Sequence, residues 1–479
     1  MIQFFEWYLP ADGKHWQRLK DESIHLSSLG VSGVWIPPCT KGTSGFDVGY
    51  GIYDLYDLGE FDQHGTVATK YGDKASLKSA VDALHAAGLK VYADIVLNHK
   101  AGADATEDIT VIEVDRGNRD RDISSPFTIS AWTRFTFPGR AGKYSAFTWG
   151  WQHFTATDYD QRTGRTSVYR IVGENKCFSE NVDQEMGNYD YLMFADIDYH
   201  HPDVIAETIQ WGKWICDELS LDGMRLDAVK HINEDFLELF VKTMRHYAAR
   251  PFFTVAEYWK DDPWLLQKYL CDEEFCMTLF DVPLHYNLFE AGCRGRDFDM
   301  RTIFDGALVI SNPQNVVTFV DNHDSQPHQA LQSFVPGWFK PSAYALILLR
   351  KDGYPCLFYG DYYGIDGDDR IPGRRAELDP LLEARKKYAY GEQVDVFDHP
   401  NVIAWQRMGD NEHPGSGLAV VISNSDEGYK DLDFGVSFAG TVWSDCTGHI
   451  CDRLTLTCEG RGRFYVKGGS VSVWVRAAG

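Results

Sequence analysis

The sequence lacks the positive charge that binding to nucleic acid requires. Its 479 residues include 46 Lys and Arg against 70 Asp and Glu, which gives a formal net charge of −24 at pH 7. Proteins bind phosphate backbones through stripes of Lys and Arg, and an excess of acidic groups repels those backbones. We therefore expect no nucleic-acid partner.

Long apolar runs are also missing. The strongest, such as Ala343–Leu349, fall far short of the roughly 20 residues that a membrane helix needs. The opening segment Met1–Trp7 is patterned like a buried strand and has neither the basic region nor the small-residue cleavage site of a signal peptide. We expect no membrane partner and a cytoplasmic location. Secretion is the alternative, if a leader precedes Met1 in the natural protein.

Cysteine is scarce, because ten cysteines in 479 residues are too few for a disulfide scaffold. Cys446, His449, Cys451 and Cys458 lie close enough in sequence to suggest zinc, but their spacing matches no standard ligand pattern. The alternative, which we favour, is half-buried thiols on C-terminal strands. A disulfide within this group would count against the cytoplasm.

The sequence does contain ample material for a packed core, with 44% hydrophobic and 14% aromatic residues. Short apolar segments rich in β-formers alternate with amphipathic helical stretches over most of the chain. The helical stretches include Ser76–Ala87, Val204–Leu219, Glu234–Tyr247 and Ser342–Arg350. The strand candidates are Ile2–Trp7, Gly33–Pro37, Lys90–Leu97, Asp222–Asp227, Phe252–Glu257, Thr278–Val282, Val316–Val320 and Pro355–Tyr359.

Alternation of strands and helices predicts parallel strands joined by right-handed crossovers. Eight such units fit a closed (β/α)₈ TIM barrel. An open doubly wound sheet is the alternative, but no glycine-rich phosphate turn follows the first strand.

Two stretches break the alternation. From Lys100 to about His200 the helical period vanishes, which predicts an inserted β-rich subdomain after the third strand. After Tyr390 short alternating strands such as Gly417–Ile422 predict a C-terminal antiparallel β-sandwich. We expect the barrel over residues 1–99 and 201–389, the insertion over 100–200 and the sandwich over 390–479.

Carboxylates gather at the carboxyl ends of the predicted barrel strands, where TIM barrels carry their catalytic groups. Asp227, Glu257 and Asp324 follow three different strands. Paired carboxylates suit glycoside hydrolysis, in which one attacks the anomeric carbon and the other protonates the leaving oxygen. One such Asp alone would mean little, since many only cap a helix.

The neighbours of these carboxylates suggest their roles. Arg225 lies two residues before Asp227, so both side chains face the same side of the strand, and the guanidinium would keep Asp227 ionised as a nucleophile. Glu257 has no basic neighbour in its own segment, and aromatic walls would favour its neutral, acid form. Asp324, beside His323, could stabilise positive charge that develops on the sugar.

Four blocks of sequence carry a resemblance to a known family. They are Asp94-x-x-x-Asn98-His99, Gly223-x-Arg225-x-Asp227-Ala228-x-Lys230-His231, Glu257 within Val-Ala-Glu-Tyr-Trp, and Phe319-x-Asp321-Asn322-His323-Asp324. In this order and spacing they resemble the alpha-amylase family, glycoside hydrolase family 13. Essentially the whole chain is similar to the liquefying-type and cytoplasmic bacterial members. Only the middle of the insertion and the last ~90 residues match loosely.

The resemblance implies a role for each matching residue. Asp227 would be the nucleophile, Glu257 the general acid/base and Asp324 the transition-state stabiliser. Arg225 would orient the nucleophile. The remaining residues would bind sugar: His99, His231 and His323 by hydrogen bonds, Tyr50 by stacking, and Lys230 and Trp259 on the leaving side. Tyr50 and Trp259 could instead be core aromatics, and Lys230 a solvated lysine at a helix start.

The resemblance also implies a calcium ion that joins the insertion to the barrel. Its ligands would be Asn98, Asp190, Asp196 and the backbone carbonyl of His231, all hard oxygens of the kind that calcium prefers. The alternative is that the aspartates are only turn and cap residues. Liquefying relatives have further acidic ligands for more ions, where this chain has Thr155, Ser179 and His200. We therefore expect one Ca²⁺.

Together these features predict an endo-acting, retaining alpha-amylase. It would cleave starch, glycogen or maltodextrins as a monomer, with some transglycosylation. A catalytically inactive glucan-binding protein is one alternative, although such proteins usually lack the nucleophile or the acid. Another activity within the family, such as α-glucosidase, branching enzyme or a cyclodextrin-processing enzyme, is the closer rival.

Overall fold

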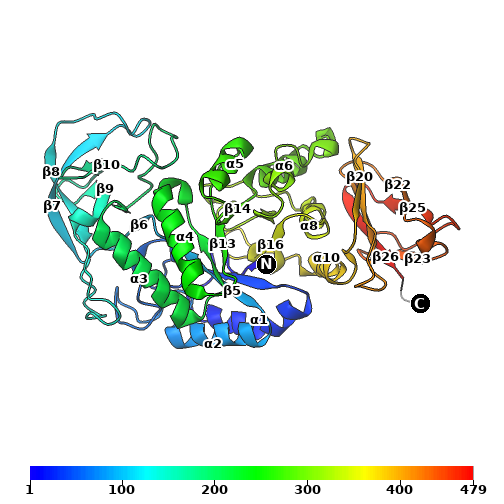
Figure 1. Ribbon diagram of the computed structural model, residues 1–479, viewed down its shortest axis with the longest axis horizontal. Helices are drawn as coiled ribbons and strands as arrows, with labels where there is room; N and C mark the ends of the chain where they lie inside the picture. Colours follow the sequence, from blue (N-terminus) through cyan, green and yellow to red (C-terminus); the bar gives the residue numbers. More distant parts are fainter. Residues whose placement is uncertain (478–479) are drawn as a thin grey trace.

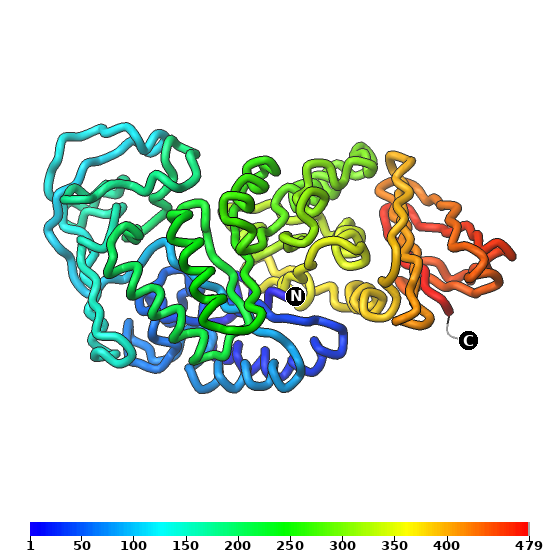
Figure 2. The backbone as a smooth tube through the Cα atoms, viewed as in Figure 1, coloured from blue at the N-terminus to red at the C-terminus, as the bar shows by residue number. Residues whose placement is uncertain are grey.

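The chain forms three parts in a row, as a computed structural model that describes residues 1–477 shows (Figure 1). The barrel lies in the middle, a β-rich insertion lies at one end, and the C-terminal β-sheets lie at the other. The backbone trace in Figure 2 shows the chain leaving the barrel for the insertion, returning to complete the barrel, and then passing into the terminal sheets.

Eight parallel strands close the barrel in the order β1-β16-β15-β14-β13-β12-β5-β2. All eight coincide with strand candidates from the sequence, so the prediction of a closed barrel is confirmed and the open sheet is wrong. Their bounds are β1 Ile2–Gln3, β2 Gly33–Ile36, β5 Lys90–Ile95, β12 Gly223–Leu226, β13 Phe253–Ala256, β14 Thr278–Phe280, β15 Val316–Phe319 and β16 Tyr354–Phe358.

Helices surround the barrel, and short polar side chains fix where several of them begin. Asp73, Asn233, Asp262 and Asp281 each accept a hydrogen bond from a backbone N–H in the first turn of the following helix. The helices are α1 His15–Ser28, α2 Lys74–Ala86, α3 Pro202–Leu219, α4 Glu234–Ala248, α5 Pro263–Asp272, α6 Val282–Arg294, α7 Leu308–Ser311, α8 Lys340–Leu348, α9 Tyr359–Tyr362 and α10 Arg375–Tyr388. Short strand pairs β3–β4 (Lys41–Gly42, Ile52–Asp54) and β17–β18 (Gly364–Ile365, Ile371–Pro372) lie in the loops between them.

The insertion follows β5 and forms a six-stranded sheet in the order β6-β11-β9-β10-β7-β8. The strands are β6 His99–Lys100, β7 Ala105–Val114, β8 Phe127–Arg134, β9 Phe154–Asp160, β10 Arg165–Ile171 and β11 Ala195–Ile197. The pairings that the sheet makes are antiparallel. The strands β6 and β11 lie next to the barrel mouth because β6 begins only four residues after β5 ends.

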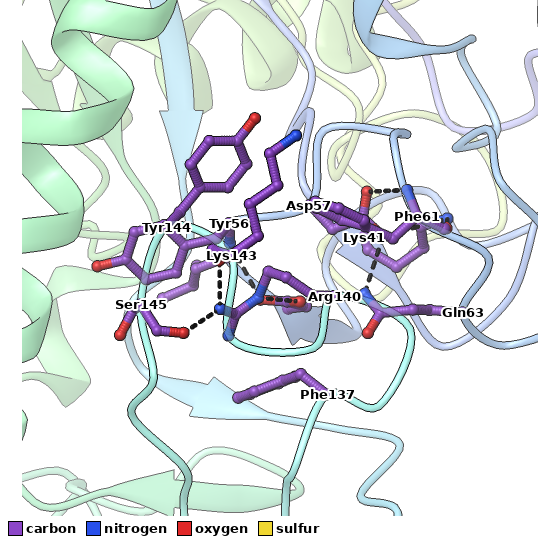
Figure 3. A network of polar contacts seen from close by, with 12 residues as sticks. Lys41, Tyr56, Asp57, Phe61, Gln63, Phe137, Arg140, Lys143, Tyr144 and Ser145 are labelled. Atoms are coloured by element: carbon purple, nitrogen blue, oxygen red, sulfur yellow. Dashed lines mark hydrogen bonds and ion pairs between the residues drawn. The ribbon is translucent and has the colours of Figure 1, made fainter.

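Buried ion pairs attach the insertion to the barrel loops (Figure 3). Arg140 of the insertion pairs with Asp54 of β4 at 2.8 Å, and both side chains are about 1% exposed. Gln63 donates hydrogen bonds to Asp54 and to Asp57, which in turn lies 3.5 Å from the Lys41 ammonium. The Arg140–Asp54 pair thus joins the insertion to the barrel, and removing Arg140 would leave the Asp54 charge buried without its ion-pair partner.

The C-terminal part stacks two antiparallel sheets around its own apolar core. The larger sheet has the order β19-β20-β21-β26-β23-β24, and the smaller consists of β22 and β25. The bounds are β19 Gln393–Val396, β20 Val402–Arg407, β21 Leu418–Ser423, β22 Gly428–Asp433, β23 Val442–Asp445, β24 Leu454–Thr455, β25 Arg461–Val466 and β26 Ser470–Arg476.

The cysteine group of this part contains free thiols. Cys446 is half-buried, and Cys451 and Cys458 are exposed. The Nδ1 of His449 lies 2.7 Å from the Val471 carbonyl oxygen, so this histidine already has a partner. Across residues 1–477, no three or more His, Cys, Asp or Glu side chains are placed to hold a metal ion, and no helix is both long and apolar enough to cross a bilayer.

Candidate active site

Two of the three predicted catalytic carboxyls follow directly on barrel strands. Arg225 lies on β12, Asp227 comes one residue after that strand, and Glu257 comes immediately after β13. The backbone N–H of Asp227 donates to Ile95 O, and that of Glu257 donates to Leu226 O, both at 2.9 Å, so the ladder extends to these residues. Gly223 is needed where β12 and β13 approach, because a Cβ there would lie 2.2 Å from the carbonyl oxygen of Phe253.

Arg225 is the centre of the site. Its Nη1 donates to Asp94 Oδ1 at 2.8 Å and to Asp227 Oδ1 at 2.7 Å, and its Nη2 lies 2.8 Å from Glu257 Oε2. The side chain is fully buried, so these contacts are not screened by water. One guanidinium thus serves three carboxylates from three adjacent strands. The segment of Glu257 contains no basic residue, as the sequence shows, and its basic neighbour Arg225 comes from the adjacent strand β12.

Burial and charge set the protonation of the two central carboxyls. Burial raises the pKa of Asp227 to about 6, although the positive charge of Arg225 lowers it. The anion of Asp227 therefore still predominates at neutral pH. Burial raises the pKa of Glu257 as well, and Asp227 adds to this effect. The Oε1 of Glu257 is buried without a hydrogen-bond partner, whereas its Oε2 accepts from the Ala228 N–H at 3.2 Å. Oε1 is therefore the oxygen available to carry a proton.

Asp324 lies on the loop after β15. A buried ion pair holds the start of this loop in place. The Lys340 ammonium contacts Asp321 at 2.6 Å and also Asp361. Asp321 accepts from the Ser325 hydroxyl at 2.9 Å, and this closes the turn that presents Asp324. Burial, together with the charge of Glu257, raises the pKa of Asp324 well above its ordinary value.

Three aromatic rings lie together at the barrel mouth. Tyr50 is parallel to His323 within 7° at 5.1 Å and to Trp7 within 5° at 5.9 Å. The Tyr50 hydroxyl donates to Asp94 Oδ2 at 2.8 Å, and the Trp35 Nε1–H donates to the same oxygen at 3.0 Å. Asp94 lies in one of the four sequence blocks and Trp7 ends the first strand candidate, but the sequence predicted no role for either. Their position at strand ends was the signal that could have found them.

The other predicted sugar-binding residues surround this group. The ring nitrogens of His99 and His231 lie 2.9 Å from Tyr50 O and 2.7 Å from Tyr189 O, and burial lowers their pKa values to about 4 and about 3. Both imidazoles are therefore neutral at physiological pH. Lys230 donates to the Trp259 carbonyl at 3.4 Å. It also donates to Glu185 at 3.3 Å, a residue that the sequence reasoning did not single out.

Trp259 is less accessible than the sequence suggested. It is 9% exposed, its Nε1–H donates to the Tyr286 hydroxyl at 3.0 Å, and its ring packs 6.0 Å from that of Phe319. The backbone of Trp259 thus lies beside Lys230, whereas most of its ring belongs to the core.

The predicted calcium ligands lie together between the insertion and the barrel. The Asn98 amide donates to Asp196 Oδ1 at 3.3 Å, and the Thr155 hydroxyl donates to the other oxygen of the same carboxylate. Burial raises the pKa values of Asp190 (to about 7) and Asp196, and the charge of Asp190 raises that of Asp196 further. A small cavity is lined by Asn98, Asp190 and His231. Two buried carboxylates that repel one another beside an amide oxygen fit a divalent cation with hard oxygen ligands.

A lysine supplies a fixed positive charge close to these ligands. The Lys176 ammonium contacts Asp198 and the backbone oxygen of Gln152, and it is only 5% exposed. His200 Nδ1 lies 3.3 Å from the other oxygen of Asp198. Asp198 is therefore already neutralised by side chains. The sequence reasoning missed Lys176 because it lies in the loosely matching part of the insertion.

Comparison with known proteins gives a consistent result. Residues 17–399 match the family model for the alpha-amylase catalytic domain. The alpha-amylase of Bacillus licheniformis is 51% identical over 99% of this chain and 93% of its own. The glucan 1,4-alpha-maltohexaosidase of Bacillus sp. (strain 707) is also 51% identical, over 99% of this chain and 92% of its own. The cytoplasmic alpha-amylase of Escherichia coli (strain K12) is 42% identical, over 99% of this chain and 98% of its own.

Solved structures show the same fold. The acarbose complex of an alpha-amylase from Geobacillus thermoleovorans covers 97% of this chain and 93% of its own with a TM-score of 0.64. An Anoxybacillus alpha-amylase covers 100% and 97% with a TM-score of 0.65. At 18% and 19% sequence identity, these similarities show the fold alone.

Proposed function

The chain belongs to the alpha-amylase family, glycoside hydrolase family 13, and from this premise we propose that it is an endo-acting, retaining α-1,4-glucan hydrolase. Its substrates would be starch, glycogen or maltodextrins. The observation that carries the proposal is the Asp227–Arg225–Glu257 bridge, which holds the two carboxyls side by side at the barrel mouth.

The proposed reaction has two steps. Asp227 attacks the anomeric carbon while Glu257 gives its proton to the departing glycosidic oxygen, so that a glycosyl–Asp227 ester forms and the leaving chain departs. Water then attacks the same carbon, Glu257 takes a proton from it, and the ester bond to Asp227 breaks. A sugar hydroxyl in place of water would give transglycosylation. For retention, the two carboxyl groups should lie about 5–5.5 Å apart.

Other residues would stabilise the transition state and the bound sugar. Asp324 faces the site from the loop after β15, where its carboxylate could oppose positive charge on the sugar ring. Tyr50 offers a ring for stacking, and the neutral imidazoles of His99, His231 and His323 offer hydrogen bonds. Lys230 and the partly buried Trp259 would contact the leaving side.

A hollow in the insertion supports endo-acting cleavage. It has a volume of about 530 Å³ and is lined by Trp132, Tyr159 and Phe194, among others. The Phe194 ring lies 5.4 Å from that of His99, so the hollow lies next to one of the predicted sugar-binding residues. Aromatic rings beside the proposed cleavage point would give a long glucan chain further contacts.

We also propose one structural Ca²⁺, held by Asn98, Asp190, Asp196 and the His231 carbonyl. When bound, the ion would neutralise the two buried carboxylates and tie the insertion to the loop that follows β12. The Lys176–Asp198 pair supports a single ion, because the Lys176 ammonium already neutralises the Asp198 carboxylate.

The decisive experiment is ¹H NMR of fresh digests of a long maltodextrin by the parent chain and by Asp227→Asn. New α-anomeric reducing ends from the parent alone would support retaining hydrolysis with Asp227 as the nucleophile. New β-anomers would mean inversion. No reaction by a folded, calcium-loaded parent would favour a glucan-binding protein instead.

The cytoplasm is the compartment that we propose, because of the 42% identity to the cytoplasmic alpha-amylase of Escherichia coli. Fractionation of the source cells, followed by amylase assay of the cytosol and the culture medium, tests this. Activity found mainly in the medium would contradict it.

A further inference from the structure

Two exposed tyrosines form a pair on the C-terminal sheets, far from the catalytic centre. Tyr429 of β22 and Tyr465 of β25 are directly opposite one another in the antiparallel ladder and are 47% and 48% exposed. Their ring centroids lie 5.8 Å apart at an interplanar angle of 57°. Large aromatic side chains that stay exposed as a group commonly mark a binding surface.

The tyrosines line a cavity rather than a flat face. It has a volume of about 430 Å³, within the range of small-ligand sites. Ile450, Asp452, Arg453 and Leu454, which follow β23, form another part of its wall. Trp474 also lines it, and its Nε1–H donates to the Tyr465 carbonyl at 3.1 Å, so the backbone under the ring is fixed.

The polar groups of this cavity are held in place and balance in charge. Arg463 donates two hydrogen bonds to Asp431, at 2.8 and 2.9 Å, and its guanidinium lies 4.1 Å from the centre of the Tyr429 ring. The cations in and beside the cavity are Arg453, Arg463 and Lys467, and the anions are Glu427, Asp431 and Asp452. Because neither sign is in excess, the cavity suits a neutral ligand with many hydroxyl groups better than a polyanion.

We propose that this cavity is a second binding site for α-1,4-glucan chains. The C–H faces of glucose rings pack on aromatic rings, and their hydroxyls bond to planar groups such as the Arg463–Asp431 pair. Two rings tilted by 57° suit successive sugars of a chain that turns at each linkage. In Figure 1, β22 and β25 lie in the sandwich at the end of the molecule opposite the insertion, so the site holds a polymer while another stretch occupies the barrel mouth.

This inference rests on the proposed function, and its test separates the two. The binding chain carries Asp227→Asn, so that substrate is not consumed, and its retardation is measured in gels that contain amylose. Adding Tyr429→Ala and Tyr465→Ala removes two stacking rings, for which we expect about tenfold weaker retardation. The matched control is Tyr247→Ala on α4, a 40% exposed tyrosine outside the cavity, which should leave retardation unchanged.

Equal retardation of the double variant and the control would overturn the inference. Hydrolysis of maltoheptaose by the parent chain reports on the proposed function separately, because a heptamer cannot reach both sites. If the alanine variant melts early, Tyr429→Leu with Tyr465→Leu replaces it, because leucine keeps apolar volume without a flat ring, and the same weakening is expected. Hydrogen exchange of the Asp227→Asn chain with and without amylose adds a direct readout. Protection within 428–431 and 463–467 is expected, and its absence would contradict the site.

Discussion

At the scale of single residues, Arg225 decides the chemistry that the site can perform. Its two terminal nitrogens divide between Asp227 and Glu257, and this makes the pKa values of the two carboxyls interdependent. Asp94 accepts a further hydrogen bond from the same Nη1 that binds Asp227, at 2.8 Å. A lysine could not replace Arg225, because a single ammonium cannot reach three carboxylates in this geometry.

Asp227→Asn and Glu257→Gln should each lower kcat by at least about 10⁴-fold, because each removes a group that acts on the reacting atoms. Both changes are isosteric, so far-UV circular dichroism should be unchanged. Glu459→Gln, on an exposed glutamate of the terminal sheets, is the matched control and should keep parental kcat. Near-parental activity of either active-site variant would refute the corresponding role.

The dependence of activity on pH follows from the same two carboxyls. Asp227 must be ionised and its pKa is about 6, so kcat/KM should fall as the pH drops through about 6. Glu257 must be protonated and its pKa is raised, so activity should fall again on the alkaline side, where it loses its proton. A pH–rate profile on a soluble maltooligosaccharide measures both limbs. An acid limb centred near pH 4 would argue against the raised pKa of Asp227.

At the scale of elements, buried charge rather than apolar contact alone joins the insertion to the barrel. The sequence predicted that residues after the third strand leave the barrel, because the helical period stops there. It gave no sign that Arg140 would meet Asp54, since 86 residues separate them and either could have been a surface charge. Their pairing depends on the fold, which brings β4 beside the insertion.

Arg140→Met should cost about 3–5 kcal/mol of stability, because it leaves Asp54 buried without its ion-pair partner. Arg162→Met is the matched control. It removes the exposed Arg162–Asp108 pair of the same insertion and should cost under about 1 kcal/mol. Urea unfolding of the three proteins measures both values. Equal losses in the free energy of unfolding for the two variants would show that the buried pair stabilises the protein no more than the exposed pair does.

At the scale of the whole molecule, the three parts divide the work. The barrel carries the proposed catalytic carboxylates, the insertion carries the hollow beside His99 and two of the four proposed calcium ligands, and the terminal sheets carry the cavity between Tyr429 and Tyr465. The proposed calcium ion would link the insertion to the barrel, so its removal should destabilise both parts and not only the residues that bind it.

Removal of calcium by a chelator should lower the melting temperature by several degrees, since a ligand at 100 to 1,000 times its Kd adds about 3–4 kcal/mol. Differential scanning calorimetry before and after chelation measures the shift, and added Ca²⁺ should restore it. Asp196→Asn should abolish the response. An unchanged melting curve would contradict a structural ion, and metal analysis that returns two or more ions per chain would contradict a single site.

The sequence by itself determined the barrel, the place of the insertion and the three carboxylates at strand ends. The barrel and the insertion follow from local pattern, because hydrophobic periodicity and the alternation of strands and helices can be read from consecutive residues. The carboxylates follow from their positions, because the carboxyl ends of the strands of a closed parallel barrel meet at one face. Only the tertiary structure decided the partners. The contact of Arg225 with Glu257, the Lys176 ammonium beside Asp198 and the facing of Tyr429 with Tyr465 join residues on different elements. Their energies depend on burial and distance, which no local pattern encodes.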